Sequence, residues 1–256
     1  MSIIAFRALL VTALCLALAG CASVATRESS ESDDPFEPLN RTVLDVNLAL
    51  DDALIKPMAE AYRALLPAFV RDRIRSMIDN LAEPRIMAND LLQGRPDAAR
   101  ITLGRFVLNT FAGIGGMFDA ATPQGFPRQS GDFGQTLYTW GVSDGPYVVL
   151  LFFGPSNIRD TVGLGVDLFT TPPALVVTGH AGALTGAVVG TVDGIDLRSR
   201  NIETLDEIKA SALDLYAHLK SITRQHRGAQ LREARGAKDE PVELIDPAAP
   251  ASERPK

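Results

Sequence analysis

The segment from Gly131 to Asp160 constrains the fold of this 256-residue chain more than any other. Its sequence is GDFGQTLYTWGVSDGPYVVLLFFGPSNIRD, and residues 145–158 within it carry no charge. Seven consecutive apolar residues, Tyr147 to Phe153, are bounded on each side by Gly and Pro. A helix needs about 20 such residues to span a bilayer. The run is therefore a buried strand, a buried helix or a wedge that enters a single leaflet, and periodicity alone does not separate these.

The first 20 residues have the organisation of a secretory signal peptide, in which Arg7 precedes an apolar stretch that ends in small residues. Residues 18–21, Leu-Ala-Gly-Cys, resemble a bacterial lipobox. That resemblance implies cleavage before Cys21, a diacylglycerol on its sulfur and an acyl chain on its amine, and Ala22 after it favours the outer membrane. The alternative is an ordinary signal peptide with a chance cysteine. Three acyl chains form a stable anchor, since about two suffice.

The remaining chain divides by composition. Residues 21–34 are expected to be the acylated cysteine and a polar tether, because they contain almost no large apolar residue. Residues 228–256 are rich in Ala, Pro and charge, and we predict a disordered C-terminal tail there. Residues 35–227 are expected to form a single domain. The net charge of −6, without any basic block, argues against nucleic acid as a partner.

Most of this domain has helical periodicity. The pattern predicts helices over Pro67–Leu81, from Pro84 to Gly94, from Pro96 through Phe111 and over Ile202–Arg227. The one strand-like stretch is Thr136–Trp140, and no partner strand lies beside it. The sequence therefore predicts an all-α fold.

Residues 168–192 contain no Asp, Glu, Lys or Arg, and the part after Pro173 is nearly long enough to cross a hydrocarbon core. Gly182, Gly186, Gly190 and Gly194 recur every fourth residue, which predicts a smooth strip for the close approach of another helix. A helix that is apolar all round is either buried in a soluble core or faces lipid.

One feature favours an enzyme. Residues 141–145, Gly-Val-Ser-Asp-Gly, match the G-x-S-x-G motif of hydrolases, and Thr136–Trp140 before them would be the strand of a nucleophile elbow. A helix must then follow Ser143, but a Gly-Pro pair and the apolar run come next. No H-E-x-x-H metal motif occurs either. We therefore expect no catalytic residue, no metal and no cofactor, and a periplasmic lipid hydrolase is the less favoured alternative.

A series of short motifs runs through the domain. They are DPFEPLNR at 34–41, NLAEP at 80–84, LLQG at 91–94, NT at 109–110, GIGG at 113–116 with Asp119, DFGQTL at 132–137, WGV at 140–142, GPY at 145–147, GPS at 154–156 and RD at 159–160. Together they resemble the MlaA (VacJ) family of outer-membrane lipoproteins over roughly residues 34–227. The block from Asp132 to Asp160 is specific enough to indicate a family, as a lone glycine motif is not.

This resemblance implies a single membrane-embedded helical domain, ring-shaped with a central amphipathic channel, in the inner leaflet of the outer membrane. It implies that the protein removes mislocalised phospholipid from the outer leaflet and passes it to a soluble periplasmic carrier (MlaC-like). A trimeric porin of the outer membrane is the implied membrane partner, and lipid asymmetry is the implied result. The resemblance also implies that this transfer makes and breaks no covalent bond. A structural, porin-associated lipoprotein is the alternative.

Ten motif residues are candidates for family-specific, membrane or lipid contacts: Asn40, Arg41, Asn109, Gly134, Trp140, Tyr147, Phe152, Phe153, Arg159 and Asp160. The first two lie near a helix start, where Asn either caps the helix or, with the Arg, contacts the porin or a headgroup. The adjacent Arg and Asp form either a structural ion pair or a lipid site. The Trp and Tyr lie at the membrane interface or in the core, and we expect the run from Tyr147 to Phe153, with both Phe side chains, to contact acyl chains.

Overall fold

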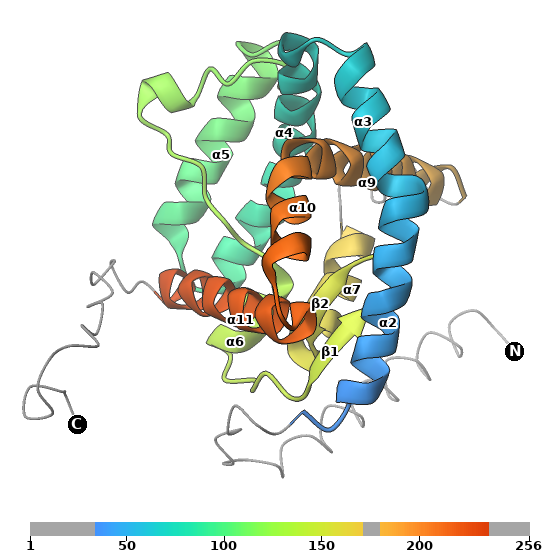
Figure 1. Ribbon diagram of the computed structural model, residues 1–256. Helices are drawn as coiled ribbons and strands as arrows, with labels where there is room; N and C mark the ends of the chain where they lie inside the picture. The colour runs from blue at the N-terminus through green and yellow to red at the C-terminus, as the bar shows by residue number, and fades with distance from the viewer. Residues whose placement is uncertain (1–33, 171–179, 236–256) are drawn as a thin grey trace, which may run out of the picture. The chain divides into compact units, whose positions relative to one another are not determined.

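The computed structural model describes residues 34–170 and 180–235, which are mostly helical (Figure 1). The chain divides into two compact units, Met1–Pro35 and Phe36–Lys256, and the described residues lie almost entirely in the second. The predicted signal peptide, Cys21 and nearly all of the predicted tether lie outside the described residues. None of the described helices is long and apolar enough to cross a membrane.

The second unit begins with three consecutive helical elements: α2 (Glu37–Leu50), the π-helical turn η1 (Asp51–Ile55) and α3 (Lys56–Leu65). Pro57, just after the π turn, has no N–H to donate to the carbonyl of Ala53, which favours a local widening of the helix. α3 packs against α9 (His180–Arg200). Arg198 of α9 also joins η1, because it donates hydrogen bonds of 2.8 and 3.0 Å to Asp51.

The next two helices, α4 (Ala68–Leu92) and α5 (Pro96–Phe111), pack against each other. Gly94, with a φ of +72°, turns the chain between them. The predicted helix end at Gly94 and the predicted start at Pro96 are thus confirmed. The predicted boundary at Pro84 is wrong, because α4 continues through it. A proline removes one helical hydrogen bond, and the packing of α4 against α5 outweighs that loss.

Residues 112–132 connect α5 to the short helix α6 (Phe133–Thr139) and include the 3-10 turn η2 (Thr122–Gln124). Asp132 caps α6, because its carboxylate accepts a hydrogen bond from the backbone N–H of Gln135 at 2.8 Å. The strand expected over Thr136–Trp140 is therefore wrong. The cap and the packing of α6 on the following helix override the strand propensity of these residues.

The strands come from the apolar run and the motif after it. β1 (Tyr147–Leu150) and β2 (Gly154–Asn157) pair antiparallel, with Tyr147 opposite Asn157 and Leu150 opposite Gly154. Residues 151–153 form the turn between them. The all-α prediction therefore misses this hairpin and is correct in being mostly helical. The apolar run is divided between a strand and the tip of a hairpin.

The C-terminal half contains α7 (Ile158–Thr170), α9, α10 (Ile202–Ser211) and α11 (Leu215–Ala234). The single helix predicted over residues 202–227 is wrong, since α10 and α11 run in different directions (Figure 1). Asp214 starts the second one by accepting a hydrogen bond from the N–H of Ala217 at 3.1 Å. The predicted disordered tail, beginning at residue 228, starts too early because α11 extends to Ala234.

The glycines of α9 do not pack as predicted. A Cβ built at Gly186, Gly190 or Gly194 would meet no atom of the described residues within 4 Å. The expected close approach of a second helix is therefore wrong for this part of the chain. Close approach occurs between α6 and α7 instead, where a Cβ on Gly163 would clash with the backbone nitrogen of Gly134.

Candidate functional site

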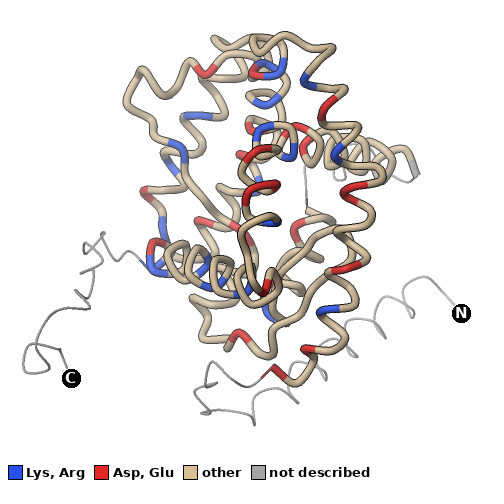
Figure 2. Tube along the Cα trace, in the orientation of Figure 1, with Lys and Arg blue, Asp and Glu red and all other residues tan. Residues whose placement is uncertain are grey.

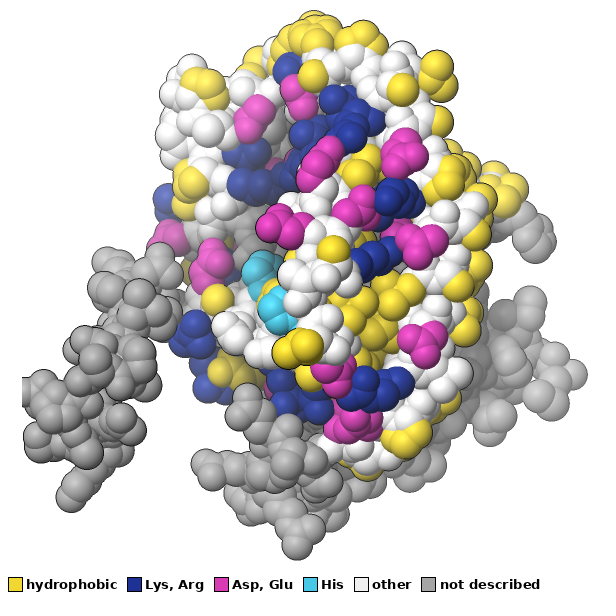
Figure 3. All heavy atoms as spheres, in the orientation of Figure 1, with side chains coloured by type: hydrophobic (Ala, Val, Ile, Leu, Met, Phe, Trp, Pro, Cys, Tyr) yellow, Lys and Arg dark blue, Asp and Glu magenta, His cyan; other side chains and the backbone are white. Residues whose placement is uncertain are grey.

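Polar and apolar side chains are distributed unusually in the described residues. The largest side chains that are almost fully buried are all polar: Arg159, Gln135, Glu83, Asn40, Thr102, Thr136, Asp90, Asp196 and Ser199. Large apolar side chains are exposed on most of the helices, and Phe111 and Phe169 are each 81% exposed. Figure 3 shows charged side chains over the middle of one face and many hydrophobic ones along its edge. Water-soluble proteins mostly bury apolar side chains and expose polar ones.

The N-terminal part of α9 extends this apolar surface. Residues 180–192 carry no charged side chain, as Figure 2 shows. Leu184 and Val188, one helical turn apart, are 67% and 62% exposed. The charged residues of α9 begin at Asp193. Two of them form ion pairs with other helical elements, Arg198 with Asp51 of η1 and Arg200 with Asp72 of α4.

The tip of the β1–β2 hairpin is apolar and exposed. Leu151, Phe152 and Phe153 are 46%, 69% and 58% exposed. Phe152 has a φ of +67°, in the left-handed region that costs a residue other than glycine about 1–2 kcal/mol. Asn47 of α2 holds this backbone, because its amide donates to the carbonyl of Leu150 at 2.9 Å and accepts from the N–H of Phe152 at 2.9 Å. Such strain in an exposed aromatic residue is typical of functional surfaces.

Asn40, two helical turns before Asn47 in α2, holds the same strand β1 by hydrogen bonds. Its amide donates to the carbonyl of Tyr147 at 3.0 Å and accepts from the N–H of Val149 at 2.8 Å. Asn40 and Asn47 together occupy the free edge of β1 as a neighbouring strand would. The predicted capping role of Asn40 is wrong, since Phe36 holds the cap position without any side-chain hydrogen bond. With 2% of its surface exposed, Asn40 is also unavailable to a porin or a headgroup.

Arg41, next to Asn40 in α2, lies on the surface. It donates to Glu37 at 2.8 Å and to Asp214 at 2.7 Å, and its guanidinium lies 4.5 Å from the ring centre of Tyr216. The hydrogen bonds from Arg41 hold the pKa of the Asp214 carboxyl at about 2, below its ordinary value of 3.8. Tyr147 packs edge-on against Tyr216 at 5.9 Å and is 5% exposed. Tyr147 is therefore a core residue, which was one of the two alternatives predicted for it, and the expected contact of the run Tyr147–Phe153 with acyl chains is wrong at this residue.

Trp140 and Asn109 have different surroundings. Trp140 is 56% exposed and donates from its indole nitrogen to the carbonyl of Leu92 at 3.0 Å. It stays a candidate for the membrane interface. Asn109 is 5% exposed and accepts a hydrogen bond from the N–H of Ala121 at 3.0 Å. Asn109 thus positions the loop after α5, and its side chain is not available for lipid.

Arg159 and Asp160 form a structural ion pair, which was one of the two alternatives predicted for them. Arg159 is 2% exposed and donates to Asp160 at 3.1 Å and also to Asp144. Its guanidinium lies 5.2 Å from the ring centre of Tyr138. These contacts fix the start of α7 against the end of α6.

Arg227 of α11 completes this network. It donates to Asp132 at 2.7 and 2.8 Å and to Asp160 at 2.9 and 2.8 Å. Burial raises the pKa of Asp160, but the hydrogen bonds and charges of Arg227 and Arg159 outweigh it and keep that pKa below its ordinary value. A Cβ on Gly134 would clash with Asp160 and lie 2.7 Å from Arg227. Gly134 therefore serves the packing of three helices.

A small polar cavity of about 80 Å³ lies between α4, α5 and the loop after α5. The residues that line it are Ser76, Asp79, Asn80, Glu83, Arg105, Asn109, Asp119 and Arg128. Arg105 donates to Glu83 at 2.9 Å and to Asp119 at 3.3 Å, and Arg128 donates to Asp79 at 2.7 Å. Burial raises the pKa of Glu83 despite the opposing effect of Arg105.

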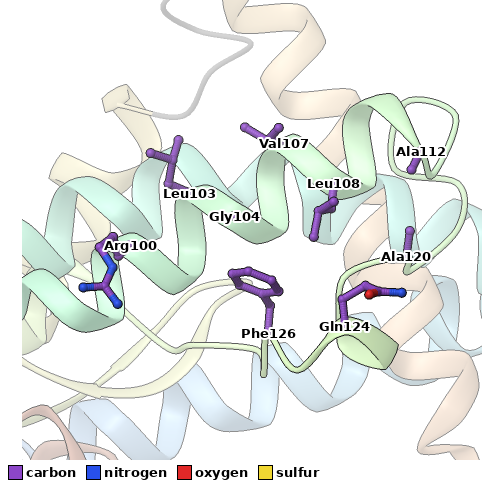
Figure 4. A pocket seen from close by; sticks show the side chains of 9 residues that line it. All are labelled: Arg100, Leu103, Gly104, Val107, Leu108, Ala112, Ala120, Gln124 and Phe126. Atoms are coloured by element: carbon purple, nitrogen blue, oxygen red, sulfur yellow. The ribbon is translucent and has the colours of Figure 1, made fainter.

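A larger groove of about 620 Å³ runs along α5 (Figure 4). Its lining is mainly apolar and consists of Leu103, Gly104, Val107, Leu108, Ala112, Ala120 and Phe126, with Arg100 and Gln124. Figure 4 shows the ring of Phe126 facing the helix beside Gly104. A Cβ at Gly104 would lie 2.5 Å from that ring, so the glycine allows the loop to approach α5.

The structure also bears on the alternative prediction of a hydrolase with Ser143 as its nucleophile. Ser143 is exposed between helix α6 and strand β1. A nucleophile elbow needs a strand before its Ser and a helix after it, and the order here is the reverse. Across residues 34–170 and 180–235, no group of three or more His, Cys, Asp or Glu is placed to hold a metal ion.

Sequence reasoning missed Asn47, Glu83, Arg105 and Arg227. Asn47 had a signal, since Asn40 and Asn47 are about two turns apart and share one face of α2. Glu83 had a weaker one, as the acidic residue inside the NLAEP motif. Arg227 had none, because its partners lie 67 and 95 residues away in the chain.

Comparison with known proteins gives consistent matches. The sequence profile of the MlaA lipoprotein family matches residues 32–230. The intermembrane phospholipid transport system lipoprotein MlaA of Escherichia coli (strain K12) is 39% identical over 156 residues, which are 59% of this chain and 62% of that protein. The protein of the same name from Haemophilus influenzae is 32% identical over 206 residues, which cover 78% of this chain and 80% of that protein. A solved structure, described as the structural basis for maintenance of bacterial outer membrane lipid asymmetry, matches with 31% identity and a TM-score of 0.67, covering 78% of this chain and 99% of its own.

Proposed function

We infer the function of this chain from its family, because the chain belongs to the MlaA lipoprotein family. Its relatives from E. coli and H. influenzae are named as lipoproteins of an intermembrane phospholipid transport system. We propose that this chain is likewise an outer-membrane lipoprotein for phospholipid transport. In this proposal it removes mislocalised phospholipid from the outer leaflet, passes it to a soluble periplasmic carrier and so maintains lipid asymmetry.

The observation that carries the proposal is the exposure of large apolar side chains around buried polar ones. Apolar surface left in water costs about 25 cal/mol for each Å², so this distribution is unfavourable for a domain surrounded by water. In hydrocarbon the same side chains are well solvated, whereas polar groups must find their partners inside the protein. The buried pair of Arg159 with Asp160 and the two hydrogen bonds of buried Asn40 with β1 meet that requirement.

We propose that the domain lies in the inner leaflet of the outer membrane as a ring around an amphipathic channel. The exposed hairpin tip, residues 151–153, and the charge-free part of α9 then contact acyl chains. Trp140 lies near the headgroups, where amphipathic rings are favoured. Cys21 carries the acyl chains that anchor the protein on the periplasmic side.

We propose two protein partners, a trimeric porin in the membrane and an MlaC-like carrier in the periplasm. A carrier is needed because a phospholipid that leaves the membrane must keep its acyl chains out of water. The transfer breaks no covalent bond, so the proposal requires neither a catalytic residue nor a cofactor.

The test is the amount of phospholipid in the outer leaflet of a strain that lacks this protein. Digestion by a phospholipase added to intact cells measures it. We expect more digestible phospholipid in the deletion strain than in its parent, and restoration by the wild-type protein. A structural, porin-associated lipoprotein predicts no change on deletion. Release of fatty acid by the purified protein, abolished by Ser143→Ala, would instead show a hydrolase.

A further inference from the structure

Two buried oxygen atoms at the small polar cavity have no hydrogen-bond partner among the described residues. They are Oδ1 of Asn80 and Oε2 of Glu83. Both residues line the cavity of about 80 Å³, and they are 4% and 2% exposed. An unpaired buried acceptor is unfavourable, and more so when it is charged. A ligand that donates hydrogen bonds would remove this cost.

Three of the residues that line the cavity already donate hydrogen bonds to protein groups. Asn80 donates its amide N–H to the hydroxyl of Thr110 at 3.0 Å. Arg105 donates to Glu83, to Asp119 and also to the carbonyl of Phe126 at 2.7 Å. Arg128 donates with both terminal nitrogens to Asp79. A phosphate or carboxylate would have to break these hydrogen bonds and would lie against the carboxylates of Asp79, Glu83 and Asp119, so the cavity does not suit an anion.

The unpaired carboxylate oxygen of Glu83 indicates a cation. Three carboxylates, those of Asp79, Glu83 and Asp119, face the guanidinium groups of Arg105 and Arg128, and Nε of Arg75 lies 3.8 Å from Oδ2 of Asp79. None of these arginines donates to Oε2 of Glu83. Calcium takes about six to eight oxygen ligands, whereas the described residues contain no convergent group of three or more metal-ligating side chains. A small organic cation with its own N–H donors fits better than a metal ion.

The cavity is reachable from one side. The side chains of Asp79 and Arg128 are 24% and 47% exposed, whereas those of Glu83 and Arg105 are 2% and 4% exposed. A cationic group would thus enter past the first pair and meet the unpaired acceptors at the inner end.

We propose that this cavity binds a primary ammonium group, and that the group belongs to the headgroup of an aminophospholipid of the phosphatidylethanolamine type. The proposal rests on phospholipid transport as the function. A primary ammonium has three N–H donors, of which two pair with Asn80 Oδ1 and Glu83 Oε2. A quaternary ammonium has none and is larger, so the cavity discriminates between the two headgroup classes.

A soluble probe tests the cavity without lipid. The full-length protein in detergent is melted with ethylammonium chloride and, as a control, with tetramethylammonium chloride at the same concentration. A ligand that binds only the folded state raises its melting temperature, and we expect a rise with ethylammonium alone. A larger rise with potassium or calcium chloride would assign the cavity to an inorganic cation. No rise with any of these salts would mean that it holds only water. Either result overturns the proposal.

Two variants test the site in opposite directions. Glu83→Gln removes the charge and one acceptor and should weaken ethylammonium binding about tenfold, and Asn80→Asp adds a charge and should strengthen it by a similar factor. General loosening of the fold would weaken binding in both. Asn80→Asp keeps the pair of Glu83 with Arg105, so it tests the site even where Glu83→Gln unfolds. Asp97→Asn is the matched control, because the Asp97 side chain is 88% exposed and lies outside the cavity.

The lipid source is tested with short-chain phosphatidylethanolamine and phosphatidylcholine. We expect the wild type to bind the ethanolamine lipid about tenfold more tightly and Glu83→Gln to lose this preference. Equal binding of both lipids by the wild type would refute the ammonium site while the function stands. Binding of neither lipid would refute phospholipid transport itself.

Discussion

Replacing Phe152 by Asp or Gly separates the role of the hairpin tip in folding from its role in the membrane. The side chain is 69% exposed, so neither substitution removes much packing. Its φ of +67° costs Phe about 1–2 kcal/mol, which Gly relieves fully and Asp in part. We expect Phe152→Gly to raise the free energy of unfolding in detergent by about 1 kcal/mol. Phe152→Asp should change it by less than about 1 kcal/mol, as exposed substitutions do.

In the membrane the same substitutions act in the other direction. An Asp near the bilayer centre costs about 3 kcal/mol on insertion scales and less toward an interface. Phe152→Asp should therefore weaken partitioning into vesicles by up to about 100-fold. Phe152→Gly loses about 2 kcal/mol of apolar burial, which weakens partitioning about 30-fold. Relative to the wild type, Phe152→Gly should thus be more stable in detergent and bind vesicles more weakly.

Circular dichroism melting in detergent measures folding, and flotation with phospholipid vesicles measures partitioning. Val149→Asp is the matched control on the same hairpin, because Val149 is 7% exposed in the apolar core with Leu44 and Tyr216. An unpaired carboxylate buried there should abolish most of the folded state. The reasoning fails if Phe152→Asp melts as low as Val149→Asp. It also fails if both Phe152 variants bind vesicles as the wild type does.

Four further predictions concern packing, acidity and the anchor. Gly190→Ala should raise the free energy of unfolding by about 1 kcal/mol, because Ala favours a helix more than Gly does. Gly163→Ala should lower it by about 1–3 kcal/mol through the clash with α6. Denaturant titration compares the two variants, and equal effects would contradict the packing described. Asn47→Ala strands two backbone groups of the hairpin and should lower that free energy by about 1–3 kcal/mol, which an unchanged melting temperature would disprove. Burial opposes ionisation of Asp119, but hydrogen bonds from Thr122 and Arg105 hold its pKa at about 2, against an ordinary 3.8. Its stabilisation of the loop after α5 is therefore complete above pH 3.8 and lost as the pH falls toward 2, and hydrogen exchange in that loop should rise over this window in the wild type and stay flat in Asp119→Asn. Cys21→Ala should remove most of the protein from the outer-membrane fraction, and full retention there would make the helical domain the true anchor.

Helix ends that depend on local chemistry could be predicted from the sequence. Gly94 ends α4 because it adopts a positive φ, and Pro96 begins α5 because its missing N–H costs nothing in the first helical turn. Both effects depend only on the residue itself. Pro84 obeys the same local rule but sits in α4, where tertiary packing overrides it. The hairpin could not be predicted, because β2 is Gly-Pro-Ser-Asn and has no strand propensity of its own. Its pairing depends on β1 and on two side chains of α2.

The candidate residues show why a motif does not reveal its own role. Asn40 was expected either to cap a helix or to meet a partner, and its amide instead pairs with a strand 107 residues away. Tyr147 was expected at the membrane or in the core, and only its neighbour Tyr216 decides for the core. Phe152 and Phe153 differ from these, because exposure at a strained turn is consistent with the predicted contact with acyl chains.

Unpaired buried atoms carry information only where space lies beside them. Such atoms also occur in Arg71, Arg73, Asp90, Ser130 and Gln135, but none of these residues lines either of the two cavities described above. Isolated cases of this kind are imperfections of packing that the fold tolerates. Asn80 and Glu83 are different, because both residues line one cavity and each has an unpaired acceptor oxygen. A packing defect explains one unpaired oxygen, whereas two at the same cavity indicate a ligand that donates to both.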